Sequence, residues 1–150
     1  MNACIKGGLM GNKFWLAGLF CCVLTVLSSV RALGETDHEV LVLQPDSDGI
    51  QRAFIVLDSY AYAPSHISIQ VGEPVEFRLE NQSFLTPHNF IMDHPDAGLQ
   101  QDVNVDAGDD VTIRFVAQVP GTYTFYCDKQ LLFFPSHREE GMEGLLEVRP

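Results

Sequence analysis

With 150 residues the chain has room for one domain, and its 9 basic and 20 acidic side chains give a formal net charge of −11. This acidic balance argues against nucleic acid as a partner, because binding phosphates requires a positive face. It favours cationic partner proteins, met at a salt-dependent rate, although solubility alone would explain the charge equally well.

The first 34 residues have the pattern of an export signal. Two lysines precede an apolar run over residues 14–30, and Ala32-Leu33-Gly34 provides the small residues that a cut before Glu35 requires. The run is short for a membrane span, which needs about 20 residues, so we expect cleavage, with a retained membrane anchor as the alternative. Residues 35–150 would then form a periplasmic or otherwise exported domain. The cut removes three basic residues and no acidic ones, which leaves a net charge of −14.

The exported domain is predicted to consist of short strands, because apolar and polar residues alternate along it and turn residues separate the segments. The candidate strands are residues 40–43, 52–58, 67–71, 75–79, 88–92, 103–105, 111–115, 122–127 and 145–148. Residues 60–64 and 93–101 are expected to be irregular, since they are rich in proline or polar residues. No segment has a long helical period. The pattern predicts an all-β fold, an antiparallel β-sandwich built from seven or eight of these segments.

Cysteine use sets the domain apart from its leader. Three of the four cysteines lie in residues 1–34, so the exported domain would keep Cys127 alone, and it could form no internal disulfide. In an oxidising compartment a lone thiol is open to oxidation and cross-linking. Binding a metal as thiolate removes that liability.

Four side chains with affinity for copper lie near the end of the chain. Cys127, His137 and Met142 fall within 16 residues, and His88 lies upstream. Two imidazoles and a thiolate with a weak, long methionine bond form the trigonal set that holds copper for electron transfer. Zinc also accepts cysteine and histidine, but a thioether is not a usual zinc ligand, so Met142 favours copper.

The ordered set of motifs resembles the cupredoxin family of type 1 copper proteins, over approximately residues 40–149. The segments that carry the resemblance are residues 62–75, Pro87-His88-Asn89-Phe90, residues 120–127 and residues 137–144. The resemblance implies a Greek-key sandwich with one copper ion at one end. It implies His88, Cys127, His137 and Met142 as ligands, and Asn89 as the residue that braces the ligand loop by hydrogen bonding.

The loop between the cysteine and the second histidine departs from plastocyanin-like and azurin-like members, in which it is much shorter. Nine residues, 128–136, separate Cys127 from His137. A longer gap is similar to that in the copper domain of nitrite reductases and in some periplasmic cupredoxins linked to copper tolerance. Within it, residues 131–135 are all apolar, and they are expected either to form a docking patch or to fold over the site and exclude water.

Three histidines, His38, His66 and His94, stand outside this pattern. They are expected to be solvated, with a weak second copper site as the alternative.

The resemblance implies one-electron transfer between redox partners, such as a cationic cytochrome or an oxidase. Cys127 would supply the thiolate path and His137 a solvent-exposed exit for the electron. The alternative is a periplasmic copper-handling or copper-tolerance protein that delivers the ion to a copper-transport protein.

Catalysis is not expected, because copper enzymes of this kind combine several domains and further centres with His-x-His pairs. The chain contains no such pair. Contact with a membrane is expected only if the N-terminal segment is retained.

Overall fold

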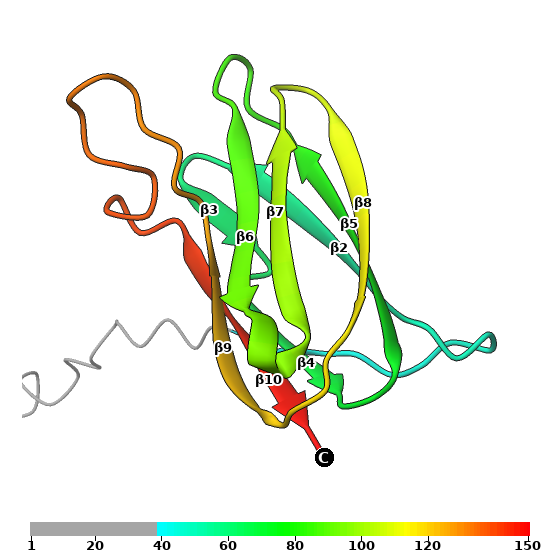
Figure 1. Ribbon diagram of the computed structural model, residues 1–150. Helices are drawn as coiled ribbons and strands as arrows, with labels where there is room; N and C mark the ends of the chain where they lie inside the picture. Colours follow the sequence, from blue (N-terminus) through cyan, green and yellow to red (C-terminus); the bar gives the residue numbers. More distant parts are fainter. Residues whose placement is uncertain (1–38) are drawn as a thin grey trace, which may run out of the picture. The chain divides into compact units, whose positions relative to one another are not determined.

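The computed structural model describes residues 39–150, which form an all-β sandwich with one short 3-10 helix, η1 (Pro95–Ala97) (Figure 1). The strands are β1 (Leu41–Val42), β2 (Gln51–Asp58), β3 (Ala61–Ala63), β4 (His66–Gln70), β5 (Pro74–Asn81), β6 (His88–His94), β7 (Leu99–Val105), β8 (Asp110–Val116), β9 (Gly121–Tyr126) and β10 (Glu143–Arg149). No helix among these residues is long and apolar enough to cross a bilayer. The leader predicted over residues 1–34 lies outside the described part of the chain.

The strands form two sheets, in the orders β1-β4-β10-β9-β6-β7 and β3-β2-β5-β8. The predicted sandwich is confirmed, but its pairing is mixed rather than wholly antiparallel. The pairs β1–β4, β4–β10 and β2–β5 are parallel, whereas β9–β10, β6–β7, β5–β8 and β2–β3 are antiparallel. Alternation in a sequence reports which face a side chain occupies and carries no information about the direction of the neighbouring strand.

Two segments expected to be irregular are in fact partly strand. Tyr62 lies in β3, and Leu99 begins β7, which pairs with β6 along its whole length. Both side chains are buried although their neighbours are polar or small. Backbone pairing with an adjacent strand stabilises such segments, and a composition-based reading does not detect it.

The core fills the space between the two sheets, and its centre is aromatic. Phe90 stacks on Phe125 with ring centroids 4.9 Å apart, and Tyr62 meets Phe125 edge-on at 5.1 Å. Phe125 and Cys127 share one face of β9 and its extension, and both are completely buried. The alternation that places the aromatic ring in the core therefore also directs the thiol inward, at one end of the sandwich.

Replacing Gly144 with alanine should destabilise the protein. A Cβ at this position would lie 2.6 Å from the carbonyl oxygen of Ser65 and would overlap the ring of Phe125. Overpacking of this kind costs about 1–3 kcal/mol of the free energy of unfolding, measurable by urea denaturation. Glu143→Ala, at an exposed position of the same strand, is the control and should change the stability much less. Equal stabilities for the two variants would contradict this packing.

Candidate metal centre

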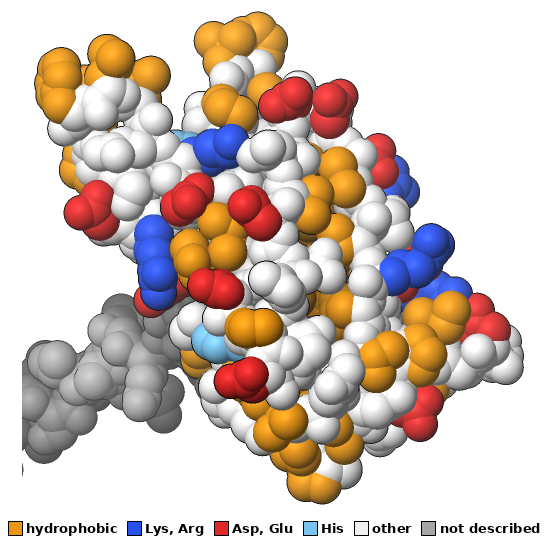
Figure 2. Space-filling view, viewed as in Figure 1, with side chains coloured by type: hydrophobic (Ala, Val, Ile, Leu, Met, Phe, Trp, Pro, Cys, Tyr) orange, Lys and Arg blue, Asp and Glu red, His pale blue; other side chains and the backbone are white. Residues whose placement is uncertain are grey.

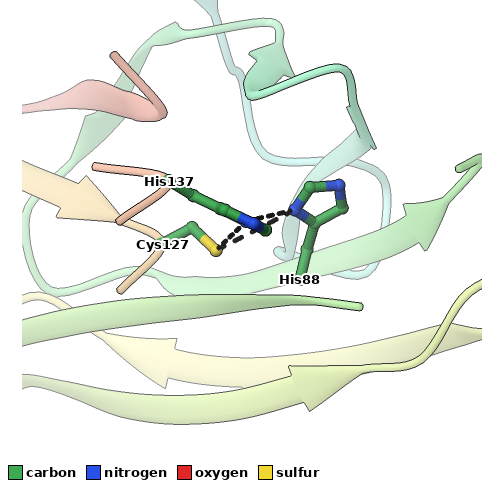
Figure 3. Close-up of side chains that lie close together, drawn as sticks. All are labelled: His88, Cys127 and His137. Carbon is green, nitrogen blue, oxygen red and sulfur yellow. Dashed lines mark hydrogen bonds between the residues drawn. The ribbon is translucent and has the colours of Figure 1, made fainter. Parts of the chain in front are cut away.

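Three of the predicted ligands meet at one end of the sandwich, although they come from distant parts of the chain (Figure 3). His88 is the first residue of β6, Cys127 directly follows β9, and His137 lies in the long connection from β9 to β10. Their donor atoms all lie within 4.8 Å of one another. Among residues 39–150, these three side chains are the group found that could hold a metal ion.

Both imidazoles present the Nδ1 atom to the thiol. The two Nδ1 atoms of His88 and His137 are 3.1 Å apart. The Sγ atom of Cys127 lies 3.4 Å from Nδ1 of His137 and 3.9 Å from Nδ1 of His88. Imidazole nitrogens bind a metal at about 2.0–2.1 Å, so a separation of 3.1 Å is compatible with one shared ion. The donors, two nitrogens and a sulfur, fit a trigonal copper site.

A short chain of hydrogen bonds fixes the tautomer of His88. Its Nε2 atom lies 2.9 Å from Oγ of Ser83, and that hydroxyl donates to a carboxylate oxygen of Asp58 at 3.2 Å. Because the single hydroxyl proton goes to Asp58, Ser83 accepts the proton of Nε2 and leaves the Nδ1 lone pair free. No sequence motif indicates Ser83 or Asp58, since their role arises only because the loop before β6 lies close to the end of β2.

Asn81 holds Ser83 in place. Its side-chain amide donates to the carbonyl oxygens of Thr86 and Val105, both at 2.9 Å, and its carbonyl accepts the backbone N–H of Ser83 at 2.9 Å. Asn81 is buried, so these bonds are costly to break. The loop before His88 is therefore anchored at both ends.

Asn89 joins β6 to the beginning of the long loop. Its side chain exchanges two hydrogen bonds with Asp128, at 2.8 and 3.1 Å, and its backbone N–H points to Sγ of Cys127 at 3.4 Å. The hydroxyl of Tyr62 donates to the carbonyl oxygen of Asn89 at 2.6 Å. These hydrogen bonds connect the start of β6 with the start of the long loop, and one of them reaches the thiol sulfur.

Met142 lies fully buried, at the end of the same connection. Its carbonyl oxygen accepts the N–H of Cys127 at 3.1 Å, and its own N–H donates to the carbonyl oxygen of His137 at 2.8 Å. The backbone of Met142 is thus bonded to the residues that carry two of the three donors.

Burial controls the protonation of the donors. Desolvation, followed by the charge of the nearby His137, lowers the pKa of His88 to about 4, and the charge of Asp58 partly opposes this shift. Desolvation, followed by the charge of Lys129, also lowers the pKa of His137. Burial raises the pKa of the Cys127 thiol. At neutral pH the imidazoles are therefore uncharged and ready to bind a cation, whereas the thiol releases its proton only when a metal replaces it.

The apolar part of the long loop projects from this end of the molecule, and so does the loop between β5 and β6 (Figure 2). Residues 131–134 are 53–84% exposed, and Phe84 is 92% exposed. His137 itself is only 6% exposed, so the structure does not place it as the solvent-exposed edge that the sequence led us to expect. The tip of the loop extends outward, while Leu131 and Phe134 at its base line a hollow beside His137.

The remaining histidines do not join the group. His66 and His94 lie in β4 and β6 and are partly buried, and His38 lies outside the described residues.

A two-sheet sandwich with two histidines and a cysteine at one end defines the class of type 1 copper proteins. A family model described as Cupredoxin-like domain matches residues 20–137, and the chain belongs to this family. The match ends at His137 and does not reach Met142.

Two relatives of the chain are plastocyanins. That of Dryopteris crassirhizoma is 28% identical over 102 residues, covering 61% of this chain and 90% of the relative. That of Ulva prolifera is 32% identical over 97 residues, covering 61% and 89%. The family and the buried Cys/His/His group confirm the prediction of a copper protein.

Solved structures show the same fold. The metal-binding domain of the Streptococcus pneumoniae Cu(I)-exporting P-type ATPase CopA has a TM-score of 0.59 at 19% identity, covering 75% of this chain and 98% of that one. Auracyanin from Roseiflexus castenholzii has a TM-score of 0.52 at 24% identity, covering 66% and 97%. At these identities the likeness concerns the fold alone.

The stability of the metal-free protein should fall as the pH is lowered from about 6.5 to about 4. In this range the unfolded chain binds a proton on His88 that the folded protein excludes, so the free energy of unfolding decreases with falling pH, by up to about 1.4 kcal/mol per pH unit for each such group. Urea denaturation at several pH values measures this slope. His88→Gln should give a flatter curve over the same range, and an unchanged slope would contradict the burial of a neutral imidazole.

Proposed function

We propose that the chain is a mononuclear type 1 copper protein that carries single electrons, with His88, Cys127 and His137 as the principal ligands and Met142 as a weak axial ligand. When bound, the copper would supply one-electron redox chemistry by alternating between Cu(II) and Cu(I). The observation that carries the proposal is the convergence of a buried thiol and two neutral imidazoles on one point.

The surroundings of the three donors suit electron transfer because they resist movement. Ser83 and Asp58 orient His88, and Asn89 ties the thiol to the start of the long loop. A ligand set fixed by such bonds changes little between two oxidation states, which keeps the structural rearrangement accompanying each electron small. Burial also excludes water, whose reorientation would add to that cost.

The N–H of Asn89 has a second role at the sulfur. It points to Sγ of Cys127 at 3.4 Å, so it would donate to the thiolate and withdraw negative charge from it. Hydrogen bonds around the cysteine sulfur tune the redox potential of such sites, which makes Asn89 a candidate for setting the potential as well as bracing the loop.

A second candidate function is copper handling, in which the same ligands bind the ion and pass it to a copper-transport protein. The nine-residue connection between Cys127 and His137 favours copper handling, because an exposed apolar loop that carries a ligand offers a partner protein a surface to bind beside the copper site. In either case we infer that the chain is not an enzyme, since the sequence has no His-x-His pair of the kind that builds further copper centres.

We further propose that the protein is exported, with residues 1–34 removed or retained as an anchor, and that its partners are proteins with cationic surfaces. The N-terminal pattern and the net charge of −11 support this. N-terminal sequencing of the protein from exported and cytoplasmic fractions tests the proposed cut before Glu35.

Addition of Cu(II) to the metal-free protein should produce an intense visible absorption band, because the thiolate of Cys127 would transfer charge to the metal. Cys127→Ser should abolish the band, whereas His94→Gln, which removes a histidine outside the group, should leave it unchanged. Visible and paramagnetic resonance spectra with copper analysis provide the measurement. A band that survives in Cys127→Ser, or no band in the unaltered protein, would refute the ligand set.

The two candidate functions differ in whether an electron or a copper ion leaves the protein. An electron carrier should show fast electron self-exchange in line-broadening experiments on mixed oxidation states, and slow loss of copper to a Cu(I) chelator, because its ligands stay fixed. A copper-handling protein should show slow self-exchange and rapid transfer of the ion. We expect the first result, and the second would overturn electron transfer while leaving the copper site intact.

A further inference from the structure

The hairpin between β2 and β3 contains a residue that its backbone disfavours. Asp58 pairs with Ala61, so the loop has only two residues, Ser59 and Tyr60. Their φ angles are 48° and 61°, both in the left-handed region. Two-residue turns with this geometry strongly favour asparagine followed by glycine, because glycine has no Cβ to clash. A bulky tyrosine at the second position is unusual and calls for a reason outside the turn.

The ring of Tyr60 supplies such a reason, because it lies against a proposed copper ligand. Its centroid is 4.8 Å from that of His137, and the two rings meet edge to face at 71°. Tyr60 is 45% exposed, whereas His137 beneath it is 6% exposed. The turn therefore places an aromatic ring between one imidazole of the site and the solvent.

Tyr60 also separates two hollows that lead to the site. One is lined by Tyr60 together with Ser83, Phe84 and His88, and the other by Tyr60 together with Phe134 and His137. Each hollow reaches one of the two imidazoles, and the tyrosine ring belongs to the wall of both. Removing this ring would therefore take away part of the wall of both hollows.

We propose that Tyr60 is the cap of the metal centre: its ring shields His137 from water and competing ligands, and the strained turn is kept because it directs the ring there. Tyr60 is a positioning and shielding residue, not a ligand. The proposal rests on the proposed function in so far as the shielded group is a copper ligand, but the shielding itself is a property of the metal-free protein. It implies that a turn residue controls the rate at which copper enters and leaves.

The first experiment uses the metal-free protein and diethyl pyrocarbonate, which acylates accessible neutral imidazoles. Mass spectrometry gives the rate of modification at each histidine. Tyr60→Gly should raise the rate at His137 several-fold, whereas Tyr60→Phe, which keeps the ring, should leave it unchanged. His66 and His94 are internal controls whose rates should be the same in all three proteins. Equal rates at His137 in the unaltered protein and Tyr60→Gly would overturn the proposal.

The stability of the same variants separates shielding from a merely structural role. Glycine adopts the turn conformation without strain, so Tyr60→Gly should unfold at a urea concentration close to that of the unaltered protein, even though His137 becomes reactive. If His137 became reactive only in proportion to a loss of global stability, the ring would be a structural support and the proposal would fail.

A copper-release measurement then connects the cap with the site. In the loaded protein, Tyr60→Gly should lose copper to a Cu(I) chelator several-fold faster than either the unaltered protein or Tyr60→Phe. Identical release rates in the three proteins would overturn the proposal that Tyr60 caps the metal centre. If the unaltered protein bound no copper, the proposed function would fail, and protection of His137 in the metal-free protein would still support the shielding role of Tyr60.

Discussion

The hydrogen bonds between Asn89 and Asp128 are the constraint on which the site depends. They join the start of β6 to the residue after Cys127, and thus hold together the start of β6, which carries His88, and the end of β9, which the thiol follows. The long connection from β9 to β10 therefore starts from a fixed point, and Met142 fixes its end through backbone bonds to both Cys127 and His137.

The neutral donor groups and the strained turn at Tyr60 are both related to the exclusion of water from one end of the sandwich. Burial lowers the pKa values of His88 and His137 and raises that of Cys127, so the group carries no charge until a metal arrives. The left-handed turn at Tyr60 serves the same purpose from outside. A local conformational cost is tolerated where packing around the site compensates for it.

The sequence was sufficient to predict the sandwich, because its strands alternate apolar and polar residues, and to single out the residue types that the structure brings together at His88, Cys127 and His137. The sequence was insufficient to predict features that depend on backbone pairing or on contacts between separate segments. The parallel pairing of β4 with β10 leaves no trace in alternation, and the strand around Tyr62 is stabilised by hairpin pairing with β2, which the composition of the segment does not indicate. Ser83 and Asp58 act on His88 only because the loop before β6 contacts the end of β2.

The burial of His137 changes how a partner would reach the site. A histidine edge open to solvent would allow direct contact, but here the ring of Tyr60 and the bases of two apolar loops intervene. Tyr60 lines one hollow together with the exposed Phe84 of the first loop, and a second hollow together with Phe134 of the other loop. A partner that touches both loops would therefore lie over Tyr60 and not over the imidazole. Because removal of apolar surface from water drives such contacts, while the net charge of −11 governs their approach, association would be steered by charge and completed by these two loops.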